Sequence, residues 1–365
     1  MIWSPASPPG RGRRGLRTSI DGGEMRGSDK AQAGHPSQPY FEKGDACVDV
    51  IIAARDRSDT IERAVKSALS EPNVRTVIVV DDGSLDDTAA VASRCGRDDD
   101  RLVVRALPTN RGPSAARNTA LDISTAPWIC VLDGDDYLLP GRIATLLARA
   151  ANWDFVADDL LQVNEQKIGY EAPVPVLFGG SFDPRPLNLE GFVCGNIRPH
   201  GVHRRELGFL KPLIRRAFID RYRLRYDESL RLGEDYEFYT RALALGARFL
   251  VVPAAGYVSV VRADSLSARH NRQDLERLRD SDTVLLGRPH LTVGERRALR
   301  AHRESVDCRV QWLVVIEAVK SRDYSRFAGA FLRSMTISIY LGRRLFEEIG
   351  SRIAPGRRAR STNGN

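Results

Sequence analysis

The sequence predicts an α/β protein in which a mostly parallel sheet is flanked by helices, followed by a helical C-terminal extension. Two observations lead to this prediction. Short apolar segments alternate with amphipathic helical segments from residue 48 onward, and such alternation is typical of parallel sheets with right-handed crossovers. Acidic and polar motifs also follow several apolar segments directly. Because open α/β sheets bind ligands at the carboxyl ends of their strands, we expect these motifs to meet at one edge of the sheet.

The composition supports a folded, non-exported protein. The 365 residues are 42% hydrophobic and 28% charged, which is ordinary for soluble proteins and enough for one large domain or two smaller ones. No apolar stretch approaches the roughly 20 residues that span a bilayer, and no secretory signal is apparent near the start. The five cysteines are scattered and odd in number, which favours reduced thiols. We therefore expect a cytoplasmic location.

The formal net charge is +8, and arginines gather in residues 11–17 and 343–360. Such segments attract nucleic acid or anionic membrane surfaces, or are merely solvated. No nucleic-acid-binding motif accompanies them, so we predict no nucleic-acid partner. The C-terminal segment also carries apolar residues, which favours contact with a membrane surface.

The first predicted strand is Val48–Ala54, an uninterrupted apolar run apart from Asp49. Residues 1–44 before it are rich in Pro, Gly, Ser and Arg, and we expect them to be disordered. A helix should follow the strand, with Asp59 and Glu62 as a reciprocal capping pair. Its apolar face is formed by Ile61, Ala64, Val65, Ala68 and Leu69.

The second predicted strand, Val77–Val80, ends in Asp81-Asp82-Gly83-Ser84. Gly83 permits a tight turn after the strand. Ser84 and Asp87 match a second capping box, so we expect a helix to begin there.

The third and fourth strands are predicted at Leu102–Val104 and Trp128–Leu132, with a helix over Ser114–Asp122 between them. Later elements are less regular. We expect a strand over Trp153–Asp158, a loop-rich segment over residues 164–200, and a helix that begins at Gly233-Glu234-Asp235 and ends before Gly246.

A late strand is predicted at Phe249–Pro253, and the chain is predicted to be helical from about Asp274. The resulting division is a disordered segment over 1–44, a catalytic domain over 45–265, a helical region over 266–350 and a disordered basic tail over 351–365.

The most informative motif is Asp133-Gly134-Asp135-Asp136, which follows the fourth predicted strand directly. Carboxylates held this close repel one another unless a cation neutralises them. Bound Mg²⁺ or Mn²⁺ would resolve the conflict and bridge to a diphosphate. The alternatives are a simple acidic turn and the aspartyl nucleophile of an Asp-x-Asp phosphatase.

Three further groups carry chemistry that would complement such a cation. Asp82 can accept hydrogen bonds from a base or a ribose. Arg117 offers a planar fork for phosphate or carboxylate, or a structural ion pair. Glu234 and Asp235 stand at a predicted helix start, where the helix dipole favours acids, and either could serve as a general base. The histidines show no metal-ligand spacing.

Together and in this order, these motifs resemble glycosyltransferase family 2 over about residues 48–262. The resemblance implies the A-type glycosyltransferase fold and an inverting, metal-dependent transfer from a nucleoside-diphosphate sugar. It also implies roles for individual residues, in which the nucleotide-binding group is Ala53, Arg55, Asp82, Arg117 and Asp133. Asp135 would bind the metal, and Asp235, or alternatively Glu234, would be the catalytic base. The chain departs from the family at Ala54, where proline is common, and at Asp56, where asparagine is common.

Within the family, Trp153–Asp158 and Gly208–Pro212 resemble bacterial glucosyltransferases of succinoglycan-type exopolysaccharide assembly. This resemblance implies a UDP-sugar donor, with glucose expected, and a lipid-linked oligosaccharide acceptor at the cytoplasmic face of the inner membrane. A nucleotidyltransferase and a non-catalytic nucleotide-sugar-binding protein remain as alternatives.

Overall fold

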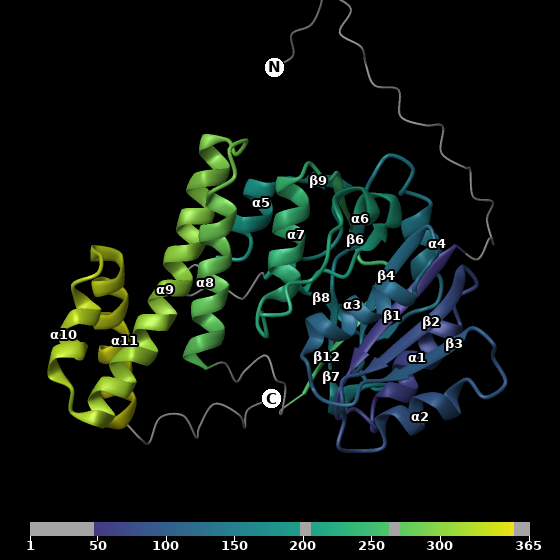
Figure 1. Ribbon diagram of the computed structural model, residues 1–365, viewed down its shortest axis with the longest axis horizontal. Coiled ribbons are helices and arrows are strands. Elements are labelled where there is room, and N and C mark those ends of the chain that lie inside the picture. The colour runs from purple at the N-terminus through teal and green to yellow at the C-terminus, as the bar shows by residue number, and fades with distance from the viewer. Residues whose placement is uncertain (1–46, 198–205, 263–270, 354–365) are drawn as a thin grey trace, which may run out of the picture. The chain divides into compact units, whose positions relative to one another are not determined.

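The computed structural model describes residues 47–197, 206–262 and 271–353 (Figure 1). The segment 1–44 and residues 354–365 of the predicted tail lie outside the described residues, so the expected disorder there stays a prediction. Residues 351–353 belong to the last helix.

The central sheet has eight strands in the order β3-β2-β1-β4-β10-β6-β11-β9. Their bounds are β1 Val48–Ala54, β2 Val74–Asp81, β3 Leu102–Ala106, β4 Trp128–Asp133, β6 Phe155–Asp158, β9 Arg185–Leu187, β10 Leu213–Arg215 and β11 Phe249–Val252. Strand β1 pairs in parallel with β2 and β4, and β6 pairs in parallel with β11. Strand β10 runs antiparallel between β4 and β6. The prediction of a mostly parallel sheet flanked by helices is confirmed.

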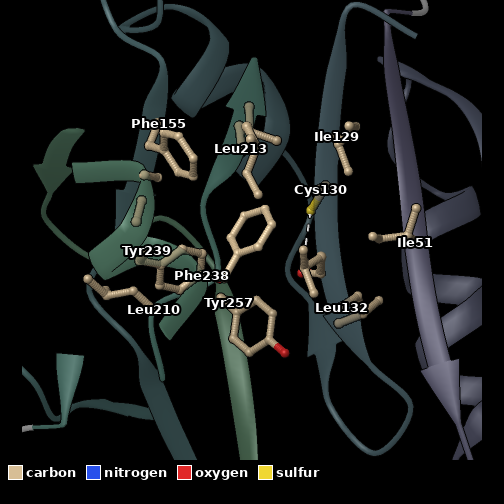
Figure 2. Close-up of a cluster of buried hydrophobic side chains, with 14 of the residues drawn as sticks. Ile51, Ile129, Cys130, Leu132, Phe155, Leu210, Leu213, Phe238, Tyr239 and Tyr257 are labelled. Atoms are coloured by element: carbon tan, nitrogen blue, oxygen red, sulfur yellow. Dashed lines mark hydrogen bonds between the residues drawn. The ribbon is translucent and has the colours of Figure 1, made fainter. Parts of the chain in front are cut away.

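The middle of the sheet is buried on both faces, which explains its uninterrupted apolar strands. In β1, Ile51 lies opposite Ile78 of β2 and Val131 of β4. Figure 2 shows how the core continues past Ile129 and Leu132 to aromatic rings from distant segments. Among these, Phe155 stacks on Phe249 with ring centroids 5.5 Å apart.

The flanking helices are α1 Ile61–Leu69, α2 Thr88–Cys95, α3 Pro113–Ile123, α4 Arg142–Leu147, α5 Leu189–Cys194, α6 Arg216–Tyr222 and α7 Glu234–Ala244. Both predicted capping boxes are wrong. Helix α1 begins after Thr60 without a side-chain cap, because Asp59 instead pairs with Arg262 at 2.7 Å. Helix α2 also lacks a side-chain cap, because the Ser84 hydroxyl bonds to Asp81.

The segment predicted to be loop-rich is more ordered than expected. Besides helix α5, it contributes strand β9 to the central sheet and β8 (Val174–Pro175) to a second sheet. That sheet has the order β5-β12-β7-β8, with β5 Tyr137–Leu138, β7 Leu161–Asn164 and β12 Tyr257–Val261. Two short 3-10 helices cover Glu165–Lys167 and Leu207–Phe209.

The C-terminal region forms helices α8 Arg272–Leu286, α9 Val293–Ser321, α10 Tyr324–Phe331 and α11 Met335–Ile353 (Figure 1). Helix α8 contacts α7, and α9 contacts α5. Leu278 and Leu299 belong to the same buried cluster as the sheet, so α8 and α9 share its core. Helices α10 and α11 pack on α9 around a separate cluster that includes Ile337 and Leu341. Among the described helices, none combines the length and the apolar character that crossing a membrane requires.

Candidate active site

A cavity of about 580 Å³ opens beside the carboxyl ends of β1, β2 and β4. The eight residues predicted for the site all line this cavity, namely Ala53, Arg55, Asp82, Arg117, Asp133, Asp135, Glu234 and Asp235. The ends of the parallel strands β1, β2 and β4 bring five of them together as expected. Helix α3 supplies Arg117, and the start of helix α7 supplies Glu234 and Asp235.

The turn after β2 is built around Gly83, which has φ +65°. A Cβ at this position would lie 2.7 Å from the backbone nitrogen of Asn110, so only glycine fits. The close approach lets Asp82 accept hydrogen bonds from the backbone N–H groups of Arg111 and Gly112, at 2.7 and 2.8 Å. Asp82 thus holds the loop before α3 against the cavity.

The three acids after β4 lie in different environments. Asp133 contacts Arg117 and Lys211. Asp135 pairs with Arg57 at 3.2 Å. Asp136 also lines the cavity, but its carboxyl accepts hydrogen bonds from the Tyr257 hydroxyl and the Val260 N–H, both at 2.8 Å.

The pKa values of the three carboxyls separate accordingly. Burial, and then the charges of Asp133 and Asp135, raise the pKa of Asp136 well above its usual value. Burial and the Asp133 charge also raise the pKa of Asp135. Burial opposes ionisation of Asp133 as well, but Lys211 and Arg117 hold its pKa well below the usual range. Asp136 therefore acts as an anchor for the second sheet, and Asp133 remains ionised.

Two buried cations link Asp133 to the start of helix α7. Arg117 contacts Asp133 and Glu234, each at 2.8 Å, and reaches Asp235 at 3.5 Å. The Lys211 ammonium lies between Asp133 at 2.9 Å and Asp235 at 2.5 Å. Since both cations are 4% exposed, these pairs are little screened by solvent.

Asp235, the predicted base, occupies an unusual position. Gly233, two residues before it, has φ +72°, and a Cβ there would lie 2.7 Å from Leu278 of α8. One carboxylate oxygen of Asp235, Oδ2, is held by Lys211. The other, Oδ1, is buried and lies 3.5 Å from the Arg117 guanidinium, but it accepts no hydrogen bond from the described residues. An orphaned buried acceptor of this kind is costly, and it marks where a donor from a substrate can bind.

The donor set fits a divalent cation that takes few ligands from the protein. No group of three or more His, Cys, Asp or Glu side chains with metal-binding geometry occurs in the described ranges. Mg²⁺ is commonly held by one or two carboxylates, with phosphate and water completing its shell. Asp133 and Asp135 both line the cavity, so one or two carboxylates of the kind that such an ion takes from a protein are available there.

Sequence reasoning missed several lining residues. Lys211 lies within the segment Gly208–Pro212, but no pattern in the neighbouring sequence indicates that it contacts both Asp133 and Asp235. Arg57 follows the first strand, and apart from its charge nothing in the sequence indicates that it pairs with Asp135. His302 and Asn271 also line the cavity, although they come from the C-terminal helical region.

Comparison with known proteins identifies the family of the chain. Residues 49–211 match the profile described as Glycosyl transferase family 2. The succinoglycan biosynthesis protein ExoU of Rhizobium meliloti is 43% identical over 78% of this chain and 82% of its own length. ExoO of the same organism is 34% identical over 78% of this chain and 79% of its own length.

A third relative matches a shorter segment. It is the Escherichia coli UDP-Glc:alpha-D-GlcNAc-diphosphoundecaprenol beta-1,3-glucosyltransferase WfaP, 37% identical over 27% of this chain and 38% of its own length.

Two solved structures share the fold. TarS 1-349 of S. aureus, in complex with UDP-GlcNAc, has a TM-score of 0.55 at 18% identity and covers 77% of this chain and 89% of that chain. The mannosyltransferase PcManGT of Pyrobaculum calidifontis, in complex with GDP-Man and Mn2+, has a TM-score of 0.53 at 16% identity. The match covers 88% of this chain and 85% of that chain. At these identities the likeness concerns the fold alone. The long match to ExoU and the family profile together show that the chain belongs to glycosyltransferase family 2 and is a transferase.

Proposed function

We propose that the protein is an inverting, metal-dependent hexosyltransferase that moves a sugar, expected to be glucose, from a UDP-sugar to a lipid-linked oligosaccharide. The pathway would be the assembly of a succinoglycan-like exopolysaccharide. The observation that carries the proposal is the orphaned Oδ1 of Asp235, which shares one cavity with Asp82, Asp133 and Asp135. The similarity to ExoU, a succinoglycan biosynthesis protein, supports the pathway, and the similarity to WfaP, a UDP-Glc:alpha-D-GlcNAc-diphosphoundecaprenol glucosyltransferase, supports the donor and the lipid-linked acceptor. We also propose the division into a catalytic domain over 45–265 and a helical region over 266–350.

On the donor side, Ala53, Arg55 and Asp82 would line the uridine pocket, with Asp133 near the ribose. Asp82 is engaged by two backbone N–H groups, so it shapes the pocket as well as offering an acceptor. Arg117 would support the nucleotide side by holding Asp133 in place. The guanidinium is shared with Glu234, so donor and acceptor sides are joined through one side chain.

On the acceptor side, Asp235 would remove the proton from the attacking hydroxyl through Oδ1. Lys211 holds Oδ2 and Arg117 lies 3.5 Å from Oδ1, so the carboxylate is fixed in place while Oδ1 still lacks a hydrogen bond among the described residues. A single displacement at the anomeric carbon inverts its configuration and requires only this one base. Glu234 is the alternative base, and one of its carboxylate oxygens, Oε1, accepts a hydrogen bond from Arg117.

Mg²⁺ or Mn²⁺, held by Asp135, would supply stabilisation of the negative charge on the departing diphosphate. Arg57 pairs with Asp135, so the chain itself places a positive charge beside this carboxylate. The backbone of Lys211 is held by Arg142, which donates a hydrogen bond to the Lys211 carbonyl at 2.5 Å.

Contact with the cytoplasmic face of the inner membrane is proposed for helix α11. Its exposed apolar side chains Met335, Ile339, Phe346 and Ile349 are 54–80% exposed, and their spacing places them along one face of the helix. Arg343 and Arg344 lie on the same helix. An apolar face beside arginines suits an anionic lipid surface.

A donor screen tests the proposal. Purified protein is incubated with Mg²⁺ or Mn²⁺, a lipid-diphosphate-linked oligosaccharide and a panel of nucleotide sugars. We expect UDP release from one UDP-sugar and a lengthened saccharide. Release of inorganic phosphate would instead indicate an Asp-x-Asp phosphatase, pyrophosphate would indicate a nucleotidyltransferase, and binding without turnover would indicate a non-catalytic protein.

A further inference from the structure

Three buried polar side chains link the helix of the predicted base to the C-terminal helices. Tyr236 follows Asp235 in α7 and donates its hydroxyl to Asp282 of α8 at 2.8 Å. The other oxygen of Asp282 lies 2.7 Å from Nδ1 of His302 in α9. The rings of Tyr236 and His302 stack, with centroids 4.1 Å apart. Asp282 is fully buried, and the other two are each 5% exposed.

The hydrogen bonds determine which nitrogen of His302 carries its proton. Burial, and then the charge of Asp282, raise the pKa of Tyr236 well above its usual value, so its hydroxyl stays protonated and donates. Asp282 is therefore the acceptor in this group, and it accepts a second hydrogen from Nδ1–H of His302. A histidine that donates from Nδ1 keeps a lone pair on Nε2 in its neutral form. Nε2 of His302 is thus available as a hydrogen-bond acceptor.

Among the residues that the structure describes, no donor uses that acceptor. Nε2 of His302 has no hydrogen-bond partner in the described part of the chain, and His302 lines the same cavity as Asp235. A purely structural role accounts for Nδ1, which bonds to Asp282, but not for the second ring nitrogen of a residue that lines the same cavity as the base. Asn271 and Leu278 of the α8 segment line the same wall, which therefore offers polar and apolar surface together, as small-molecule sites do.

We propose that Nε2 of His302 accepts a hydrogen bond from a hydroxyl of the acceptor saccharide, and that α8 and α9 form the acceptor side of the active site. The inference rests on the proposed function and adds to it the surface that binds the acceptor. Asp282 and Tyr236 position the imidazole. The profile match ends at residue 211, so this subsite lies outside the part of the chain that matches the family profile.

The test separates the two ring nitrogens. In His302→Asn, the amide can replace Nδ1 toward Asp282, but the acceptor at Nε2 is lost. In His302→Gln, the amide reaches the Nε2 position. His290→Gln is the matched control, since His290 is exposed and does not line the cavity. For each protein we measure three quantities. They are KM for a synthetic lipid-diphosphate-linked oligosaccharide, KM for the UDP-sugar, and the rate of UDP-sugar hydrolysis without acceptor.

We expect His302→Asn to raise KM for the oligosaccharide about three- to tenfold, the effect of one lost hydrogen bond. KM for the UDP-sugar and the hydrolysis rate should stay at their wild-type values, and His302→Gln should recover part of the loss. Equal acceptor KM in His302→Asn and the wild type would overturn the inference, and so would an equal loss on the donor side.

A second measurement on the wild type covers the case in which His302→Asn does not fold. Adding the oligosaccharide should shift the ¹⁵N resonance of Nε2 in His302 and leave His290 unchanged. No shift at His302 would contradict acceptor binding there. If the wild type itself transfers no sugar from any donor, the proposed function fails; wild-type transfer with an unaffected His302 variant refutes the acceptor subsite alone.

Discussion

Replacing Lys211 with methionine tests the charge network at the centre of the site. The ammonium is 4% exposed and contacts Asp133 at 2.9 Å and Asp235 at 2.5 Å. After Lys211→Met, Asp133 keeps Arg117 at 2.8 Å, but Asp235 keeps only the 3.5 Å contact. A buried carboxylate left without its partner typically costs about 3–5 kcal/mol. We expect the free energy of unfolding to fall by about that amount.

Urea denaturation at neutral pH measures this loss. The double variant Lys211→Met/Asp235→Asn should be more stable than Lys211→Met alone, because it removes the uncompensated charge. Lys167→Met is the control, since Lys167 forms an exposed pair with Glu171 and its loss should leave stability unchanged. A free energy of unfolding for Lys211→Met within about 1 kcal/mol of the wild-type value, as exposed pairs give, would refute the reasoning.

Three further predictions concern the metal, the pH dependence and the membrane. Asp135→Ala should abolish the metal-dependent part of UDP binding in calorimetry with Mn²⁺ or Mg²⁺, and unchanged binding would exclude the proposed metal role. The lowered pKa of Asp133 stabilises the folded state above the unfolded value of about 3.9, and this contribution is lost as the pH falls from there through the lower folded value. The difference in unfolding free energy between wild type and Asp133→Asn should therefore shrink on acidification, and a constant difference would contradict it. Ile339→Ser/Phe346→Ser should reduce sedimentation with phosphatidylglycerol vesicles, whereas the exposed control Val284→Ser should not; equal sedimentation of both variants and the wild type argues against lipid contact by α11.

The central strands and the acids at their ends were predictable because both depend on local sequence. A buried parallel strand is an uninterrupted apolar run, and the residue after such a run must emerge at the edge of the sheet. Asp82, Asp133 and Asp135 therefore share a cavity, although they come from two different strands.

The remaining contacts depend on partners that are distant in sequence. Asp59 leaves its expected cap for Arg262, which a local motif cannot foresee. Lys211 reaches the acids because β10 inserts antiparallel between β4 and β6, an arrangement that periodicity does not encode. The pair Asp282 and His302 joins two helices, and each residue taken alone looks like an ordinary polar position.

The catalytic base is the most direct point at which to test the proposed transfer. Asp235 lies in the first turn of helix α7, and Asp235→Asn keeps the shape of the side chain while removing its capacity to accept a proton. We predict that this variant binds the UDP-sugar as the wild type does in calorimetry, while transfer to the lipid-linked oligosaccharide falls at least about 100-fold. Transfer by Asp235→Asn at a rate near that of the wild type, with transfer lost in Glu234→Gln instead, would contradict the assignment of Asp235 as the base.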